Sequence, residues 1–371
     1  MRSPVFRTAC ALLVISAVCL IVSDATSPPA RADASVPPAK AGKWWAFVPP
    51  ADHASPVVQN SSWVRNPIDN FVLARLEAQG LSPAPEASKE TLIRRAYLDL
   101  IGVPPSPREV DAFVADPSPD AFDRVVDRLL ASPEYGERWA RHWLDLARYA
   151  ESEGFKADET RPYAWRYRDW VINAFNRDMP YDQFVREQIA GDELRPNDPQ
   201  AHVATYFLRS YPDESNARNL FQRRQELLND DTDTVGAVFL GLTFGCARCH
   251  DHKYDPIPQR DYYSLQAFFA DIRADDHIVV ASTEQVGEHD AKLAVWQQKT
   301  RDIRDEMAKL LEPKRQSLLH DYFKKYPPEI QASLLKPESE RTAMDWVLHY
   351  KAAQYMEPWS YQYLASDAIC A

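Results

Sequence analysis

Short helix-start signals divide much of this chain, each of them a Ser or Asn followed at once by proline. Proline is favoured at the first position of an α-helix, and the polar side chain before it can bond the free N–H groups of the first turn. The signals are Asn66–Pro67, Ser106–Pro107, Ser118–Pro119 and Ser132–Pro133. Apolar residues with helical spacing follow them, and no run alternates apolar and polar residues for long enough to form a sheet. The sequence therefore predicts a mainly α-helical fold with little or no sheet.

Other expected elements follow from the same kind of pattern. Ser88 is expected to cap a helix that ends at Gly102, and a helix from Pro180 is expected to end at Gly191. Residues 231–245 are apolar on nearly every side, which predicts a buried helix that carries the next residue, a cysteine, into the core. Residues 278–281 are a short apolar run that favours a single strand.

The N-terminus has the pattern of a secretory signal peptide over residues 1–32. Basic residues precede an apolar run at residues 9–22, and Ala30-Arg31-Ala32 has the form of a cleavage site. The apolar run is shorter than the ~20 residues of a membrane-spanning helix, so we expect no integral membrane span after cleavage. Lipid anchoring through Cys19 is a less favoured alternative, because Val18 stands where such signals have a smaller residue. We expect an exported protein, periplasmic or at the cell surface.

Composition divides the rest of the chain into three regions. Residues 33–62 are rich in Pro and Ala and predict a linker, with an aromatic patch at Trp44–Phe47 that docks on the folded body. Residues 63–272 carry the helix signals and predict one helical domain. Residues 273–371 predict a charged helical extension, or the truncated start of a second domain. The formal net charge of −11 argues against nucleic acid and anionic membranes as partners.

The run Cys246-Ala247-Arg248-Cys249-His250 carries the clearest chemical signal. Two thiols at this spacing followed by an imidazole form the attachment pattern for haem c, in which each thiol makes a thioether and the imidazole ligates the iron. Zinc bound with His252 as a further ligand, or a redox-active dithiol, would use the same residues. Export favours haem, because haem c is attached outside the cytoplasm. The predicted cofactor-binding residues are Cys246, Cys249 and His250, with His250 as the proximal iron ligand.

A sixth iron ligand would have to come from the opposite face of the haem. His252 cannot reach that face, because it is only two residues from His250. His142, Met179 and His202 are the candidates, and His142 is preferred because it stands in the tryptophan-rich run Arg141-His142-Trp143. A histidine with a purely structural place in the core or at the surface is the alternative.

Two classes of function are compatible with a haem in this chain. One is electron transfer with a redox partner protein, the iron cycling between its ferrous and ferric states. The other is a haem-containing exported enzyme that acts on carbohydrate or a related polymer through carboxylates. The candidate carboxylates are Asp145, Glu151, Glu153 and Asp158. The polar and aromatic residues 150–170 are typical of a pocket wall or of the residues around a cofactor. The alternative is a solvated loop followed by an amphipathic helix. A haem domain that only binds partners is a third possibility.

Several longer runs accompany the Cys-x-x-Cys-His motif. The motif lies within Asp233–Tyr263, and the other runs include Arg94–Gly102, Arg141–Tyr149 and Tyr167–Val171. Together they resemble the planctomycete-type cytochrome c domain family, found in large exported proteins of unknown function. The resemblance covers about residues 44–272 and implies a helical haem domain. The resemblance also implies that a second large domain frequently follows, and we expect that domain to be absent or barely begun in this sequence.

Overall fold

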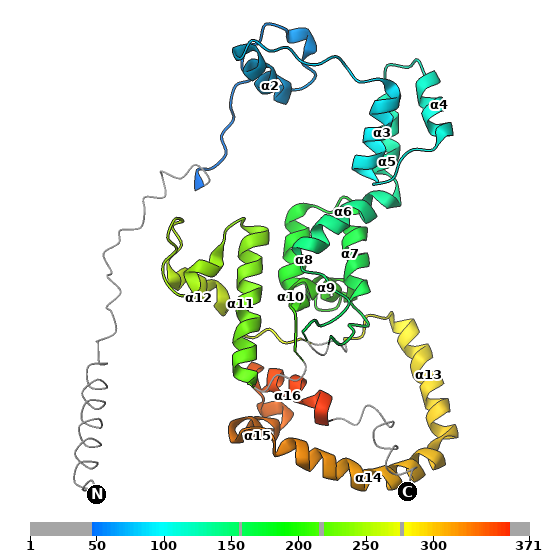
Figure 1. Ribbon diagram of the computed structural model, residues 1–371. Coiled ribbons are helices and arrows are strands. Elements are labelled where there is room, and N and C mark those ends of the chain that lie inside the picture. The colour runs from blue at the N-terminus through cyan, green and yellow to red at the C-terminus, as the bar shows by residue number, and fades with distance from the viewer. Residues whose placement is uncertain (1–46, 156–157, 215–218, 275–277, 357–371) are drawn as a thin grey trace, which may run out of the picture. The chain divides into compact units, whose positions relative to one another are not determined.

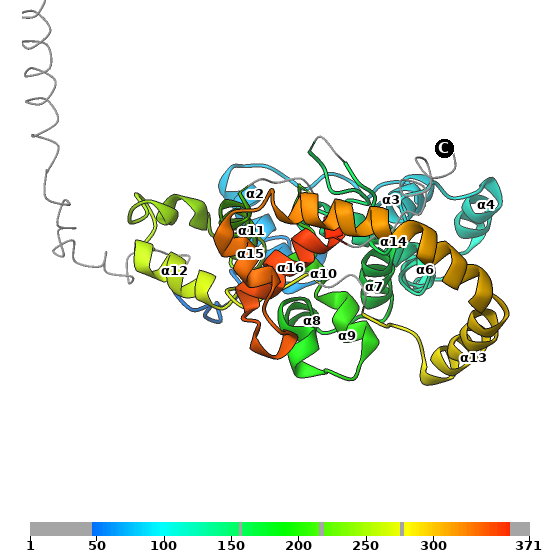
Figure 2. The same ribbon diagram turned by 90° about the horizontal axis from the view of Figure 1, so that it is seen from below.

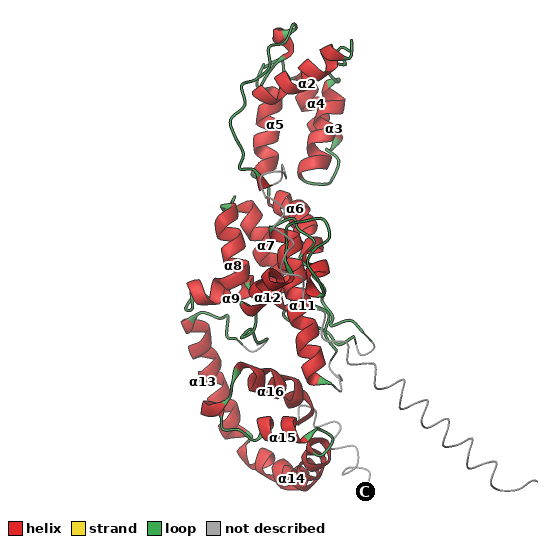
Figure 3. Ribbon diagram, turned by 90° about the vertical axis from the view of Figure 1, so that its left-hand side faces the viewer, coloured by secondary structure: helices red, strands yellow, loops and turns green. Residues whose placement is uncertain are grey.

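The computed structural model describes residues 47–155, 158–214, 219–274 and 278–356 (Figure 1). In these ranges every regular element is a helix, and the β contacts are limited to one isolated bridge between Ser152 and Thr160 (Figure 3). The predicted mainly α-helical fold is therefore confirmed. The predicted signal peptide and the Trp44–Ala46 part of the aromatic patch lie outside the described residues.

The chain divides into two compact units. An N-terminal unit comprises Met1–Pro83 and Tyr254–Pro256, and a main unit comprises Ala84–Lys253 and Ile257–Ala371. The boundary at Pro83 falls inside the helical domain expected over residues 63–272. In the N-terminal unit, η3 (Ser61–Trp63) precedes α2 (Pro67–Ala78). A capping box opens α2 at the predicted signal, since the Asn66 side chain accepts the N–H of Asp69 at 3.3 Å and the Asp69 carboxylate accepts the N–H of Asn66 at 3.1 Å.

The first helices of the main unit share a small core. They are α3 (Lys89–Leu100), α4 (Pro107–Ala115) and α5 (Ala121–Leu130). Ile93, Phe113 and Leu129 pack together between them. The caps expected at Ser88 and Ser106 are present. The start expected at Ser118–Pro119 is wrong by two residues, because the N–H of Ser118 bonds the Asp116 carboxylate in a turn before α5 begins.

Glu109 ties the cap of α4 to α3. Its carboxylate accepts the Tyr97 hydroxyl at 2.6 Å and the N–H of Ser106 at 2.8 Å. The hydrogen bond from Tyr97, helped by those from Ser106, lowers the pKa of Glu109 to about 2. The folded chain therefore holds this carboxylate ionised at pH values where the unfolded chain protonates it.

We expect Glu109→Gln to lower the free energy of unfolding by about 1 kcal/mol at pH 7, because it replaces charge-assisted hydrogen bonds at a partly exposed site. The contribution of Glu109 is present above its ordinary pKa of about 4.3 and disappears as the pH falls through about 2. Urea unfolding at a series of pH values measures whether the free energies of unfolding of wild type and variant become equal as the pH falls. Glu137→Gln, at an exposed position of the later helix α6 (Pro133–Leu146), is the control. If the difference in free energy of unfolding between wild type and Glu109→Gln persisted unchanged to pH 2, it would not come from the ionised Glu109 carboxylate.

The largest core of the main unit lies among helices that follow α5. They are α6 (Pro133–Leu146), α7 (Trp165–Asn176), α8 (Tyr181–Leu194), α9 (Pro199–Ala204), α10 (Tyr206–Arg209) and α11 (Leu220–Phe239). Buried aromatic rings fill it, and Trp143 Nε1 and the Tyr167 hydroxyl both donate to Gln188 Oε1, at 2.8 and 2.6 Å. Gly136 lets α6 approach α7, since a Cβ there would lie 2.5 Å from the Ile172 carbonyl oxygen.

Two expected elements differ in the structure. The helix from Pro180 does not end at Gly191, because α8 continues to Leu194 through a kink at Ala190. Gly191 is instead a packing position, where a Cβ would collide with the Ala201 carbonyl. Residues 278–281 form no strand.

The remaining helices follow the core. They are α12 (Gln259–Ala267), α13 (Thr283–Lys299), α14 (Arg301–Phe323), α15 (Pro328–Leu334) and α16 (Ala343–Met356), with η5 (Glu338–Glu340) before α16. No residue of α13 is buried, whereas α14 packs on α16 (Figure 2). In the described ranges, no helix has the length and apolar character needed to cross a membrane.

Candidate functional site

The Cys-x-x-Cys-His motif lies on a tight turn after α11. The helix ends at Phe239, Gly241 takes a positive φ of 65°, and the chain turns back into the 3₁₀ helix η4 (Phe244–Arg248). The Phe244 ring lies over Gly236 of α11, where a Cβ would be 2.6 Å from the ring. The expected helix over residues 231–245 is therefore wrong in its limits, since α11 spans Leu220–Phe239 and a turn separates it from the motif.

Both motif cysteines are exposed free thiols, not core residues. The buried residue of the motif is Ala247, which is 0% exposed and packs with Phe244. Residues three positions apart lie on one face of a 3₁₀ turn, and Cys249 directly follows η4 with φ −105° and ψ −23°. The expectation that a buried helix carries Cys246 into the core is thus corrected: the turn presents both thiols to solvent.

The imidazole of His250 is fixed in one tautomer. Its Nδ1 lies 2.7 Å from the Asp251 carbonyl oxygen. A carbonyl oxygen can only accept, so Nδ1 must donate its hydrogen, and the neutral ring then carries its lone pair on Nε2. This is the arrangement usual for metal-binding histidines, in which a backbone carbonyl holds the ring nitrogen that does not bind the metal.

Helix α12 holds the motif loop in place. The Arg248 carbonyl accepts hydrogen bonds from Gln259 Nε2 at 3.0 Å and from the Tyr263 hydroxyl at 2.9 Å. Asp251 in turn accepts the N–H of Gln259 at 2.7 Å and so caps α12. Sequence reasoning assigned no role to Gln259 or Tyr263. Both residues lie well beyond the motif in the sequence, and no local pattern indicates that their side chains bond the same carbonyl.

Asp233 of α11 lies beneath the motif. Its carboxylate oxygens would be 3.2 and 3.4 Å from a Cβ at Gly245, so the backbone just before Cys246 packs against it. Burial raises the pKa of the Asp233 carboxyl, while a hydrogen bond from Tyr262 and the nearby Arg248 act in the opposite direction. The turn therefore packs against Asp233 of α11 and is hydrogen-bonded to α12 through the Arg248 carbonyl.

The residues present fit a covalently attached haem. The two thiols are accessible from one side of the turn, and the next imidazole offers an unprotonated Nε2. Among the described residues, no group of three or more His, Cys, Asp or Glu side chains is placed to hold a metal ion. The alternative zinc set of Cys246, Cys249, His250 and His252 is accordingly not assembled in this structure.

The candidates for a sixth ligand lie on other elements than those packed against the motif. The motif packs on α11 and α12, whereas α6, which carries His142, packs on α3, α5 and α7. His142 is exposed, with its ring 5.6 Å from that of Trp139. His202 Nε2 donates to the Pro196 carbonyl at 2.8 Å, and Met179 packs against the main core. His142 as distal ligand stays a prediction.

Three of the four candidate catalytic carboxylates have structural partners. Glu151 pairs with Arg168 at 3.0 Å, and Asp158 accepts the N–H of Gly154 at 3.0 Å. Glu153 pairs with two arginines that are almost fully buried. Asp145 is exposed on α6. Glu153 is therefore placed to stabilise the fold.

Comparison with known proteins bears on the same region. The sequence profile of the family PSCyt2, described as a protein of unknown function (DUF1549), matches residues 67–274, more than half of the chain. The chain belongs to the PSCyt2 family. No curated protein and no solved structure matches it.

The PSCyt2 match contains the whole candidate site. It begins with α2 and ends at residue 274, after α12, so that η4 and the side chains that hold the motif lie inside it. Helices α13 to α16 lie beyond the match. PSCyt2 is a planctomycete cytochrome-associated family of unknown function. Membership therefore places the motif in a known family without assigning its chemistry.

Proposed function

We propose that this chain is an exported c-type haem protein that transfers electrons through a single covalently bound haem. The observation that carries the proposal is the hydrogen bond from His250 Nδ1 to the Asp251 carbonyl, 2.7 Å long. It leaves Nε2 free to ligate, directly beside two exposed thiols of the correct spacing. Export through the predicted signal peptide at residues 1–32 would bring the chain to the compartment where haem c is attached.

Each residue of the motif has a distinct part in this proposal. Cys246 and Cys249 would hold the haem through thioether bonds, and His250 would ligate the iron through Nε2. The bound haem supplies an iron centre that exchanges one electron. The Asp251 carbonyl orients the imidazole and increases its basicity. The hydrogen bonds of α12 to Arg248 keep the loop in position before any haem arrives.

The position of the motif favours exchange with another protein. Cys246, Cys249 and His250 are all exposed, so a redox partner could approach this edge of the main unit. The chain has a formal net charge of −11, and a partner of opposite charge would be drawn to it over a distance of about a Debye length. We therefore propose a basic redox partner protein. His142 remains the preferred sixth ligand.

The test is expression of the full chain, with its signal peptide, in a bacterium that has a c-type haem maturation system. We expect one haem per chain that survives denaturation and gives the pyridine haemochrome spectrum of a thioether-linked haem. Redox titration of the same sample should show one reversible one-electron step. A purified chain without covalent haem would contradict the haem proposal. Covalent haem without a reversible step would contradict electron transfer.

A further inference from the structure

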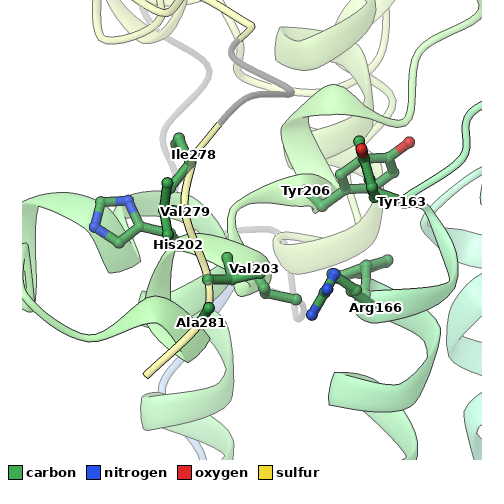
Figure 4. A pocket seen from close by; sticks show the side chains of 10 residues that line it. Tyr163, Arg166, His202, Val203, Tyr206, Ile278, Val279 and Ala281 are labelled. Carbon is green, nitrogen blue, oxygen red and sulfur yellow. The ribbon is translucent and has the colours of Figure 1, made fainter. Parts of the chain in front are cut away.

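A pocket lies in the main unit where α7, α9 and the extended residues 278–281 meet (Figure 4). Its volume is about 310 Å³, at the lower end of the usual range for small-molecule sites. Neither cysteine of the motif lines it, nor does His250. The pocket is thus separate from the proposed haem site, and it uses the residues of the 150–170 stretch for which the haem proposal has no role.

Arg166 gives the pocket a positive charge without a counter-ion. The guanidinium lies 4.8 Å from the Trp165 ring, and the close-up shows it directed towards Val203 (Figure 4). Among the described residues Arg166 has no ion pair, whereas its neighbour Arg168 pairs with Glu151 and Asp169. A contact of the guanidinium with an aromatic ring does not consume its N–H donors, which lie in the guanidinium plane. These donors remain available to a ligand.

The remaining walls supply no acid to neutralise this charge. None of the lining residues is Asp or Glu, and the other ionisable groups are His202 and three tyrosines. His202 Nε2 already donates to the Pro196 carbonyl. Val203, Val279 and Ala281 give an apolar surface facing Arg166. A cationic pocket with apolar walls, in a chain of net charge −11, selects for an anion with an apolar body.

Tyr163, just before α7, also lines the pocket and is 52% exposed. The Tyr206 ring lines the same pocket and offers a flat surface to the rest of the ligand.

We propose that this pocket binds a small organic carboxylate with a planar apolar body. The carboxylate is held by Arg166, and the body lies against Val203, Val279 and the Tyr206 ring. The proposal does not depend on haem, because no residue of the motif takes part in the pocket.

The test uses phenylacetate as the carboxylate probe and phenylacetamide as its uncharged analogue, with isothermal titration calorimetry on the full mature chain. We expect phenylacetate to bind with a Kd of about 1–10 mM, typical of so small a ligand. Arg166→Gln should weaken this binding at least tenfold, as should the exchange of carboxylate for amide. Arg166→Lys should keep part of the affinity, since lysine retains the charge but not the fork.

Arg186→Gln is the matched control. Arg186 lies on α8 outside the pocket, with its side chain 70% exposed and 3.6 Å from Asp182, and its loss should leave the affinity unchanged. Equal affinity for phenylacetate and phenylacetamide would overturn the proposal, and so would no saturable phenylacetate binding. If Arg166→Gln fails to fold, the comparison of the affinities of phenylacetate and phenylacetamide for the wild-type chain still decides.

Discussion

The double substitution Cys246→Ser, Cys249→Ser is expected to abolish covalent haem attachment. A serine hydroxyl cannot form the thioether, so the haem stain of the denatured chain should fall at least 100-fold. Each single substitution leaves one thiol and should reduce the yield strongly. Both side chains are exposed, and exposed substitutions usually change stability by about 0.5 kcal/mol or less. Circular dichroism and thermal unfolding should therefore match those of the haem-free wild type.

The chain contains its own control for this experiment. Cys370 is the third cysteine that remains after the predicted signal peptide, and it lies outside the motif. Cys370→Ser should keep the full amount of bound haem. Haem that remains covalently bound to the double serine variant would refute the assignment. Loss of stoichiometric zinc from the double variant, with no haem in the wild type, would instead favour the zinc alternative.

The starts of several helices could be predicted because their signals are local. Proline after Asn66 or Ser106 fits the first helical position, and the polar side chain bonds the first turn whatever lies elsewhere in the fold. Ser118–Pro119 has the same pattern but lies in a turn, because the Asp116 carboxylate competes for the N–H of Ser118. Gly191 does not end α8, for a different reason. The glycine is required by the close approach of α9, which no local pattern encodes.

The sequence contains the Cys-x-x-Cys-His motif and predicts a cofactor for it, but the surroundings of the motif could not be predicted. The apolar residues before Cys246 suggest that the thiol is buried, yet Val235, Val238 and Phe239 pack in the main core. Leu242 and Phe244 pack with Ala247 beneath the turn that presents the thiols. Phe244 folds back over Gly236, and that contact depends on the turn at Gly241. The tautomer of His250 follows from the position of a backbone carbonyl. Such a position is set by the hydrogen bonds of α12, which come from residues more than one turn further along the chain.

Glu153→Ala is expected to lower the free energy of unfolding by about 3–5 kcal/mol. The Glu153 carboxylate pairs with Arg161 at 2.6 Å and with Arg209 at 2.7 Å, and these arginine side chains are only 3% and 9% exposed. Burial raises the pKa of Glu153, but the hydrogen bonds and charges of the two arginines outweigh it, so that the pKa is lowered overall. Removal of the carboxylate would leave two buried cations without their shared counter-ion. Urea unfolding at neutral pH, followed by circular dichroism, measures the loss.

Glu151 provides a matched control two residues away. It also pairs with an arginine, Arg168 at 3.0 Å, but these side chains are 59% and 40% exposed. Glu151→Ala should therefore cost less than about 1 kcal/mol. Equal losses for Glu151→Ala and Glu153→Ala would show that burial of the ion pair does not matter here.

The contrast between these two variants also bears on the enzyme alternative. A catalytic carboxylate must be free to contact a substrate, and its removal often costs little stability, since functional sites are seldom optimised for stability. Glu153 is instead enclosed by Arg161 and Arg209 and is 14% exposed. If Glu153→Ala proved as stable as wild type, the ion pairs would be dispensable and a catalytic role for this carboxylate would regain support. A loss of about 3–5 kcal/mol would assign Glu153 to the stability of the fold.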